Sequence, residues 1–400
     1  MGTHRKTCEV VVVGGGPAGL TAAIALAAAG VATALVSRRP PAPDNRTTAL
    51  LTGSVAALDA LGVWNLAREH AAPLAAIRIV DDTARLIRAP EVLFRAEEIG
   101  LEAFGHNIEN RHLVAALEAR AAALAHLARF ECGAARVAIG EDRVTIWLDN
   151  GEEIAAPLVV GADGRGSLCR AAAGIETETR SYPQAALTVN LAHARPHAGI
   201  STEFHTEAGP FTLVPLPGNR SSLVCVVEPL EAERLAGLDD ATLAEETERR
   251  AHSILGRITV AAERGVFRLA TETARAFAHS RVVLVGEAAH VMPPIGAQGL
   301  NLGLRDAATV AELVADARED PGAPALLARY DRQRRLDVTS RTLAVDLLNR
   351  TLLSDVLPVQ GARGFGLYLL DRIGPLRRAV MREGVMPLAA QPRLMRGELP

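Results

Sequence analysis

The chain has 400 residues, of which 49% are hydrophobic and 22% are charged. This composition is typical of a compact soluble protein, and the length is more than one ordinary core needs, so we expect two domains. The formal net charge of −3 provides no overall basic field for nucleic acid. We therefore predict no nucleic-acid partner.

The four cysteines, Cys8, Cys132, Cys169 and Cys225, are far apart in the sequence and show no metal-ligand spacing. Their distribution favours a reducing compartment and argues against a zinc site or a disulfide framework. An apolar strand begins within about eight residues of the N-terminus, which leaves no room for a signal peptide. We expect a cytoplasmic protein without a metal site.

The first motif is a glycine-rich turn between a strand and a helix. The strand is predicted over 9–13, the helix over 20–29 and a second strand over 31–37. The glycines of the turn fit the GxGxxG spacing, in which the first makes a tight turn, the second admits a pyrophosphate and the third packs helix on strand. The residues predicted to bind a dinucleotide here are Gly14, Gly16, Pro17, Ala18 and Gly19.

The second strand ends without the acid that usually binds the adenosine ribose. Ser37 stands at this position and Arg38 follows it. A serine can bind a ribose hydroxyl, although without the strength of a charged acceptor, whereas an arginine can accommodate a 2′-phosphate. The motif by itself therefore leaves FAD and NADP open.

Two later apolar strands also end in glycine-rich turns. LVVGADGRGSLCR, residues 158–170, places Asp163 where open α/β sheets bind ligands, although such an acid can also simply cap the next helix. GEAAHVMPPIGAQGLNLGLRDA, residues 286–307, leads into a helix that begins near Gln298. Three such strand ends can share one ligand only if the segments between them fold back onto one sheet.

The pattern changes between the second and third motifs and again near the C-terminus. Short apolar segments separated by turns, over 185–229, predict an antiparallel sheet inserted between these two motifs. Because aromatic residues make up only 3% of the chain, we expect an aliphatic lining for the substrate. Residues 343–388 predict helices rich in leucine and arginine, which either touch a membrane or partner enzyme or pack on the chain itself.

Taken together, GGGPAG, GADGRGSLCR and the 286–307 segment resemble the class A flavoprotein aromatic hydroxylases, which have the fold of p-hydroxybenzoate hydroxylase. RTTALLTGSVAALDALGVW, FGHNIENRHLVAALEARA and the C-terminal helical region are similar to the ubiquinone-biosynthesis hydroxylases. The resemblance spans roughly residues 8 to 390. It implies an α/β fold with a Rossmann-like, three-layer FAD-binding domain of the GR2 type, an inserted antiparallel-sheet substrate domain and a helical C-terminus. The implied boundaries are 1–75, 100–175 and 270–345 for the FAD-binding domain, 76–99 and 176–269 for the substrate domain, and 346–400 for the C-terminal segment.

The resemblance also implies which further residues surround FAD. Arg46 would reach the cofactor from the segment after the second strand, and Asp163 would lie near it. Glu287, where aspartate is more common, would bind the ribityl or pyrophosphate part. Asn110 stands where many relatives have Arg or Gln, and Arg111 beside it is the alternative residue for that role. Gly286, at the strand end, is a further implied contact, and the residues implied beside the isoalloxazine ring are Pro293, Gly296, Gly299, Leu300 and Asn301.

The implied activity is the hydroxylation of an aromatic ring with FAD and O2 through a C4a-hydroperoxyflavin, above all on a polyprenylated phenol of ubiquinone biosynthesis. Such chemistry needs no catalytic side chain. His290 is a candidate base, but a histidine in a loop of this kind is more often structural. The chain shows no second GxGxxG, so the reductant is NAD(P)H at the flavin site or an electron-donor protein.

Four alternatives remain open at the level of sequence. The chain could hydroxylate another small aromatic compound, reduce an isoprenoid chain on the same fold, act as a non-catalytic flavin-binding scaffold, or be an NADP-dependent dehydrogenase. The expected location is the cytoplasm, with peripheral contact to the inner face of the membrane or to a ubiquinone-biosynthesis complex as a further expectation.

Overall fold

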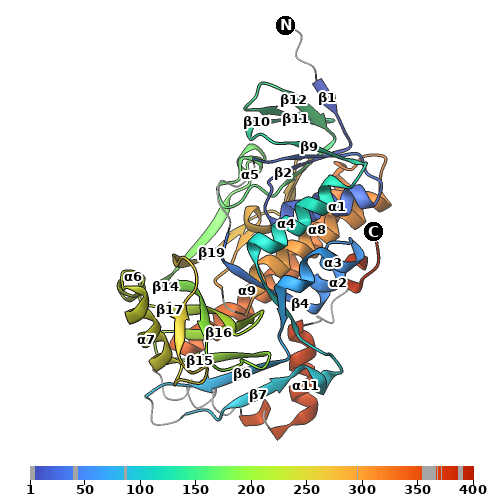
Figure 1. Cartoon of the computed structure of the whole chain (residues 1–400). Helices are drawn as coiled ribbons and strands as arrows, with labels where there is room; N and C mark the ends of the chain where they lie inside the picture. Colours follow the sequence, from blue (N-terminus) through green and yellow to red (C-terminus); the bar gives the residue numbers. More distant parts are fainter. Residues whose placement is uncertain are drawn as a thin grey trace.

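The computed structural model describes residues 5–38, 44–84, 88–294, 296–353, 366, 368–370, 372–385 and 391–400. Figure 1 shows an elongated molecule with a small sheet at one end, a parallel sheet flanked by helices in the middle, and a large antiparallel sheet at the other end.

A six-stranded sheet forms the centre of the first half. Its strands are short runs of buried valine and leucine, a pattern typical of a parallel sheet that is covered on both faces. Five strands are parallel and the edge strand β20 is antiparallel. In spatial order the strands are β20 (Ala278–His279), β21 (Val282–Leu284), β13 (Leu158–Gly161), β2 (Val10–Val13), β3 (Thr33–Val36) and β9 (Leu127–Phe130).

Helix α1 (Pro17–Ala28) packs between this sheet and the helices α8 (Gln298–Asp316) and α4 (Asn110–Ala122). α1 is rich in alanine and has no polar face, as expected for a helix buried on all sides. The small side chains of α1 let α8 approach closely. A Cβ atom added to Gly303 of α8 would lie only 3.2 Å from the Cβ atom of Ala18 of α1. The ends of α1 and α8 are thereby fixed relative to each other.

Two smaller sheets flank the parallel sheet. One of them, β1 (Arg5–Thr7), β12 (Glu153–Ala156), β11 (Val144–Leu148) and β10 (Ala134–Ile139), was not predicted from the sequence. The other consists of β4 (Thr47–Leu51), β8 (Gly105–Glu109) and β5 (Ala71–Pro73). The short helices nearby are α2 (Thr52–Ala60), α3 (Trp64–Ala67), α5 (Leu168–Ala172) and the 3-10 turns η1 (Arg68–His70) and η3 (Gly286–Ala288).

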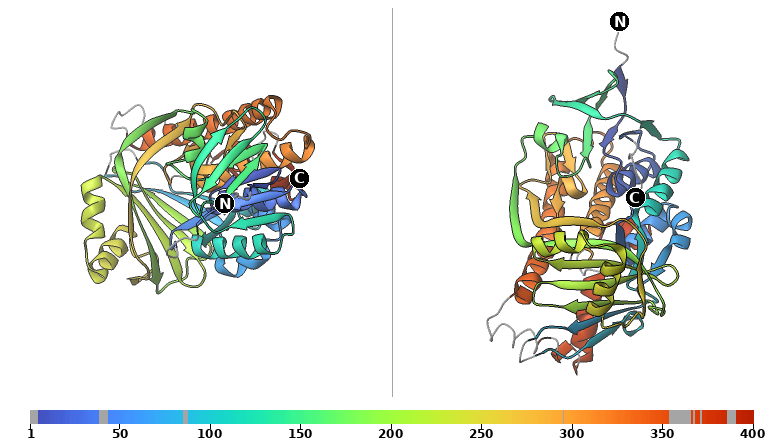
Figure 2. Two further views of the ribbon diagram at one scale, coloured as in Figure 1. Left: turned by 90° about the horizontal axis from the view of Figure 1, so that it is seen from above. Right: turned by 60° about the vertical axis from the view of Figure 1, so that its left-hand side comes forward.

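The large sheet is antiparallel except where β15 and β6 run parallel. Helices α6 (Pro229–Ala236) and α7 (Asp240–Arg250) cover one of its faces and form a core with it that is separate from the core of the parallel sheet (Figure 2). The strands in order are β22 (His290–Val291), β19 (Gly265–Ala274), β14 (Thr177–His193), β17 (Arg220–Val227), β16 (Pro210–Leu216), β15 (Ile200–His205), β6 (Ala76–Asp81) and β7 (Val92–Arg95), and β18 (Ile258–Val260) pairs with β14.

The C-terminal helices join the two halves. α9 (Pro324–Leu353) contacts the parallel sheet, where the Tyr330 hydroxyl donates to the Leu284 carbonyl at 2.8 Å. α11 (Gly374–Val385) packs Met381 and Val385 beside β7 and the 3-10 turn η2 (Ala96–Ile99), and the chain ends with η4 (Arg393–Arg396). Parts of the predicted helical region 343–388 lie outside the described residues. Among the described helices, none is long and apolar enough to cross a bilayer.

Candidate cofactor site

The three glycines of the first turn are constrained in different ways. A Cβ atom on Gly14 would lie 2.0 Å from the carbonyl oxygen of Ala162, and one on Gly19 would lie 2.2 Å from the carbonyl oxygen of Gly14. A Cβ atom on Gly16 would meet no described atom within 4 Å. The first and third glycines therefore allow β2, β13 and α1 to pack, whereas the second keeps a space open beside the N-terminus of α1.

The N-terminus of α1 is suited to a phosphate group. Gly16 is its N-cap, and no side chain in the described part of the chain caps the helix there. The first N–H groups of a helix lack partners within the helix and carry partial positive charge, so they bind anions. The open space at Gly16 and these free donors fit the pyrophosphate of a dinucleotide.

Ser37 lies at the end of β3 beside this turn. Its side chain is buried, and its Oγ has no hydrogen-bond partner among the described residues. A buried hydroxyl without a partner is unfavourable by about 1–3 kcal/mol, which is tolerated where a ligand supplies the partner. The position and the free hydroxyl fit a ribose hydroxyl group.

Arg38 points away to a surface ion pair. Its Nη2 lies 2.6 Å from Asp149 Oδ2, and its side chain is 73% exposed. The Gly133 amide donates to the same carboxylate oxygen at 3.0 Å. Arg38 is thus held next to Ser37, where its charge is already compensated.

Arg46 is held by a network that the sequence did not reveal. Its Nη2 lies 2.7 Å from Asp44 Oδ2, and the Asn110 Nδ2 donates to the same oxygen at 2.9 Å. Burial alone would raise the pKa of Asp44, but the hydrogen bonds from Arg46 and Asn110 outweigh it and lower the pKa. The Asn110 Oδ1 accepts from Thr48 at 2.7 Å. Asn110 therefore positions Arg46 through Asp44.

Arg111, the neighbour of Asn110, has a separate role. Its Nη2 lies 3.1 Å from Glu109 Oε2, and its amide donates to the Asp44 carbonyl at 2.9 Å. Glu109 is buried and also pairs with Arg220 of the large sheet at 3.1 Å. Arg111 thus belongs to the contact between the β4–β8 sheet and the large sheet.

Glu287 lies in the turn η3 after β21 and is exposed. The negative charge of Glu287 contributes to the raised pKa values of both Arg46 and Arg165, after the larger effects of Asp44 on Arg46 and of Glu272 on Arg165. Arg165 forms an ion pair with Glu272. The second and third glycine-rich motifs therefore meet near Arg46, as the sharing of one ligand requires.

Asp163 caps helix α5. Its carboxylate accepts hydrogen bonds from the Ser167 hydroxyl at 2.5 Å and from the Leu168 and Cys169 amides at 2.7 and 3.1 Å. The neighbouring Ala162 lies against Gly14 of the first turn. The side chain of Asp163 is thus engaged in its own turn, and it is the backbone of this motif that adjoins the dinucleotide turn.

The loop after β21 is anchored by a buried charge. Asp306 Oδ2 accepts from the Gly286 amide at 3.0 Å and lies 2.7 Å from His290 Nε2, while its Oδ1 accepts from Arg334 Nε at 2.6 Å. Burial alone would raise the pKa of Asp306, but the charges of His290 and Arg334 outweigh it and lower the pKa to about 2. His290, which is 2% exposed, thus holds the loop to α8. Asp306 could have been suspected, because it lies within the 286–307 motif.

The last residues of this loop bring the N-terminus of α8 to the site. Pro293 is buried, and Gly296 and Ala297 have positive φ angles of 66° and 55°. Left-handed backbone is unusual for alanine, and such outliers concentrate at functional sites. Added Cβ atoms on Gly296 and Gly299 would meet no described atom within 4 Å, so the first turn of α8 is accessible beside Leu300.

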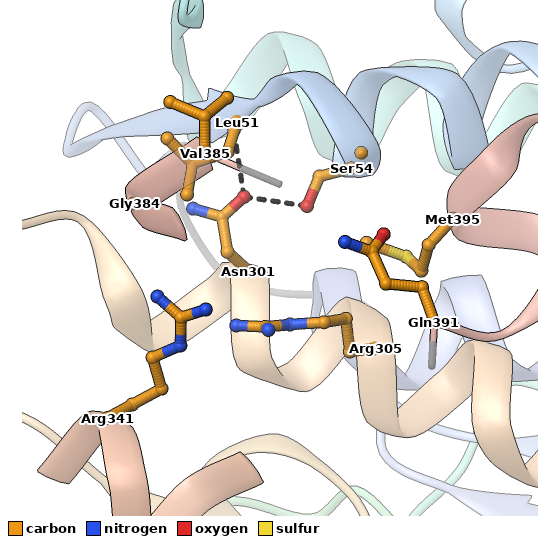
Figure 3. Close-up of a pocket in the computed structure, with 10 residues that line it drawn as sticks. Leu51, Ser54, Asn301, Arg305, Arg341, Gly384, Val385, Gln391 and Met395 are labelled. Atoms are coloured by element: carbon orange, nitrogen blue, oxygen red, sulfur yellow. Dashed lines mark hydrogen bonds between the residues drawn. The ribbon is translucent and has the colours of Figure 1, made fainter. Parts of the chain in front are cut away.

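Asn301 fixes the direction of α8. Its Oδ1 accepts from the Ser54 hydroxyl at 2.6 Å and from the Leu51 amide at 2.9 Å (Figure 3). Its Nδ2 donates to the Ala49 carbonyl at 2.8 Å. The side chain is buried and fully engaged by β4 and α2. Asn301 thus acts on the site by positioning α8.

A pocket adjoins Asn301 on the side of α9 and α11 (Figure 3). Burial, together with the nearby Arg334 and Arg341, lowers the pKa of Arg305 in this pocket to about 10, although Asp337 opposes the change. None of the residues predicted to bind the cofactor lines this pocket except Asn301. The other lining residues are Leu51, Gly53, Ser54, Arg305, Arg341, Gly384, Val385, Gln391 and Met395.

Comparison with known proteins identifies the class. The chain matches the FAD binding domain family over residues 7–344 and belongs to that family. It is 37% identical over 410 residues to the ubiquinone hydroxylase UbiL of Rhodospirillum rubrum, covering 99% of this chain and 94% of that protein. It is 30% identical over 393 residues to the 3-demethoxyubiquinol 3-hydroxylase of Escherichia coli, covering 95% and 98%. The chain is therefore an FAD-dependent monooxygenase, and this prediction is confirmed.

Solved structures confirm the predicted fold. The p-nitrophenol 4-monooxygenase PnpA from Pseudomonas putida superposes with a TM-score of 0.76 at 22% identity, covering 95% of this chain and 97% of that one. HpxO of Klebsiella pneumoniae, complexed with FAD and uric acid, superposes with a TM-score of 0.73 at 18% identity, covering 95% and 97%. At these identities the likeness concerns the fold alone.

These residues and helix ends could each hold a different part of FAD. When bound, FAD supplies the redox and oxygen chemistry, and the protein supplies position, dryness and electrostatics. The N-terminus of α1 can bind the pyrophosphate, and the Ser37 hydroxyl can bind the ribose. The N-terminus of α8 presents partial positive charge to a ring system that becomes negative on reduction. Asp306 and Asn301 keep that helix end in place.

Proposed function

We propose that this protein hydroxylates a polyprenylated phenol in ubiquinone biosynthesis, with FAD as cofactor and O2 as the oxygen source. The observation that carries the proposal is the similarity over nearly the whole chain to two proteins named for ubiquinone chemistry, at 37% and 30% identity. The glycine turn, Ser37 and the positioned α8 support FAD binding in this chain.

The test combines the purified protein with a deletion strain. We expect flavin absorbance near full occupancy, and a ubiquinone precursor lacking one ring oxygen in the deletion strain. Normal ubiquinone in the deletion strain would move the assignment to hydroxylation of another small aromatic compound or to reduction of an isoprenoid chain. A protein that also rejects added FAD would count against the cofactor site itself and favour the NADP alternative.

We further propose that FAD is bound by the residues predicted from the sequence. Those with an unpartnered hydroxyl, an exposed charged side chain or open space beside them are Gly16, Ser37, Arg46, Glu287, Gly296 and Gly299. The others act mainly through backbone or as positioning residues: Gly14, Pro17, Ala18, Gly19, Arg38, Asn110, Arg111, Asp163, Gly286, Pro293, Leu300 and Asn301.

The reductant in this proposal is NAD(P)H or an electron-donor protein. Mixing the anaerobic FAD protein with NADH or NADPH separates the two sources. Bleaching of the flavin absorbance identifies a nicotinamide donor, whereas no bleaching with either nucleotide assigns reduction to a protein.

We also propose that the protein works on the inner face of the membrane through α11, alone or within a ubiquinone-biosynthesis complex. Ile373, Leu376 and Val380 are 43%, 41% and 46% exposed, and their spacing puts them on one side of the helix. Of the exposed arginines, Arg372 lies beside this apolar stripe, whereas Arg378 and Arg382 lie on another side of the helix, where they can attract anionic headgroups without bordering the stripe. A polyprenyl substrate resides in such a membrane, which supports the arrangement.

A further inference from the structure

The face of the large sheet opposite α6 and α7 lies against the FAD-binding part of the chain. The Thr47 hydroxyl donates to Ser222 Oγ at 2.8 Å, and Asn190 Nδ2 donates to the Asn45 carbonyl at 2.9 Å. Thr47 and Asn45 flank Arg46 in the sequence. Ser222 and Asn190 are paired on neighbouring strands of the sheet and therefore mark the face that meets the cofactor site.

One row of side chains on this face remains accessible. Strand register aligns Glu203 with Thr212, Thr212 with Val224, and Val224 with Thr188, and we call these four residues the inner row. All four are partly exposed. The residues between them along the strands, which face α6 and α7, are at most 4% exposed. On the face that meets the cofactor site, an accessible row is where a ligand can contact the sheet.

The inner row leads toward the cofactor site at its β19 end. Thr188 is aligned with Gly265, and Phe267, two residues further along β19, is 40% exposed. The guanidinium carbon of Arg46 lies 5.6 Å from the centre of the Phe267 ring. Phe267 and Val224 thus offer an apolar contact between Arg46 and the rest of the row.

Glu203 is the charged member of the inner row. Its Oε1 lies 2.6 Å from Nε2 of His205, which is buried behind it on the same face of β15. The Thr212 hydroxyl lies 3.4 Å from Oε2, at the limit of a hydrogen bond. Because His205 occupies one oxygen and the Glu203 side chain is 20% exposed, the second oxygen remains able to accept a hydrogen bond from a ligand.

We infer that Glu203 binds the ring hydroxyl of the phenol substrate, with the ring lying along Thr212 and Val224 on the side toward Phe267 and Arg46. This inference rests on the proposed function. A phenol hydroxyl donates one strong hydrogen bond to a carboxylate. Such a bond orients the ring and raises the electron density on the phenol oxygen, and hence on the ring carbons ortho and para to it. Glu203 thereby sets both the specificity for phenols and the orientation of the ring.

The test compares a phenol with its methyl ether, which has lost the donor. Calorimetric titration of the FAD-containing protein with 2-octylphenol and its O-methyl ether gives the discrimination directly. A hydrogen bond to a charged group contributes about 1.5–3 kcal/mol, so we expect the phenol to bind about 10- to 100-fold more tightly. Glu203→Leu should bind the two compounds equally, and Glu203→Gln, which keeps a neutral acceptor, should show an intermediate ratio.

The control is Glu245→Leu, which changes an exposed glutamate on α7, on the other side of the sheet. It should retain the full preference for the phenol. The flavin content of each variant reports on FAD binding, and its thermal midpoint reports on folding. The Glu203→Gln variant remains informative if Glu203→Leu unfolds. Equal affinity of the wild type for both compounds, or an unchanged ratio in Glu203→Gln and Glu203→Leu, would overturn the inference. Absence of flavin from the purified wild type would instead count against the proposed function.

Discussion

At the scale of single residues, a substitution at Gly16 tests cofactor binding without disturbing the fold. A side chain at this position would enter the open space beside the N-terminus of α1 without meeting a described atom within 4 Å. Gly16→Val should therefore fold with nearly unchanged thermal stability and lose FAD, because the valine fills the space of the pyrophosphate. The flavin absorbance of the purified variant checks this expectation. Retention of full flavin content would show that the cofactor lies elsewhere.

Gly14→Val is the matched comparison for Gly16→Val. Its Cβ atom would lie 2.0 Å from the Ala162 carbonyl oxygen, and its φ angle of 120° is strained for any side chain. This variant should lose several kcal/mol of stability as well as FAD, as expected for a backbone clash in a packed core. Thermal unfolding of the two variants distinguishes a blocked site from a damaged fold.

Replacing Ser37 by alanine should change two quantities in opposite directions, the stability of the protein without FAD and its affinity for FAD. Ser37→Ala removes a buried hydroxyl that has no partner in the described chain, so the protein without FAD should gain up to about 1–3 kcal/mol of stability. The same change removes a hydrogen bond to the ribose, so FAD should bind about 2- to 10-fold more weakly. Thermal unfolding without FAD and titration with FAD measure the two effects. A stabilised variant with unchanged FAD affinity would exclude the ribose contact.

At the scale of elements, Asp306 couples the loop after β21 to α8 and α9. The pKa of Asp306 is lowered to about 2 in the folded protein, against about 3.9 for an unperturbed aspartate. A lowered folded pKa means that the contribution to stability, about 2–3 kcal/mol, is fully present above pH 3.9 and is lost as the pH falls toward 2. The free energy of unfolding followed by denaturant titration across this range should show that loss.

Asp306→Asn should remove this acid-sensitive contribution and destabilise the protein by about 3–5 kcal/mol at neutral pH, because buried Arg334 then keeps only Asp337 as a charged partner and buried His290 loses its carboxylate. Asp59→Asn, at an exposed position on α2, is the control and should leave stability and its pH dependence unchanged. A variant at Asp306 as stable as this control would show that the loop does not depend on the buried charge.

These elements also show which parts of the fold and of the site can be predicted from the sequence alone. Each glycine-rich motif combines a strand, a turn and a helix that adjoin in the chain, so local pattern was sufficient to place β2, β13, β21 and the start of α8. The network of Asp44, Asn110 and Thr48 joins segments about 60 residues apart, and nothing in their local sequence signals the contact. The sheet containing β10 to β12 was missed because its short strands carry no chemical motif. The domain boundaries and the individual site residues stay predictions.

At the scale of the whole molecule, α11 places an apolar and basic surface at the end of the protein that holds β6 and β7 (Figure 1). The opposite side of α11 is fixed to the body, since Arg377 pairs with Glu98 at 2.6 Å while Met381 and Val385 are buried. A helix anchored in this way can bind a surface through its exposed side without unfolding. The exposed stripe on α11 is therefore available to a membrane while the fold remains intact.

This arrangement predicts selective binding to anionic vesicles. The protein should sediment with vesicles that contain phosphatidylglycerol and not with pure phosphatidylcholine, and added salt should weaken the binding, because each arginine near the surface contributes about 1 kcal/mol. Leu376→Asp combined with Val380→Asp should abolish sedimentation. Leu230→Asp, at a leucine on α6 that is 79% exposed, should have no effect. Equal sedimentation of the α11 variant and the α6 control would refute membrane contact through α11, and binding that persists with pure phosphatidylcholine would refute the role of the arginines.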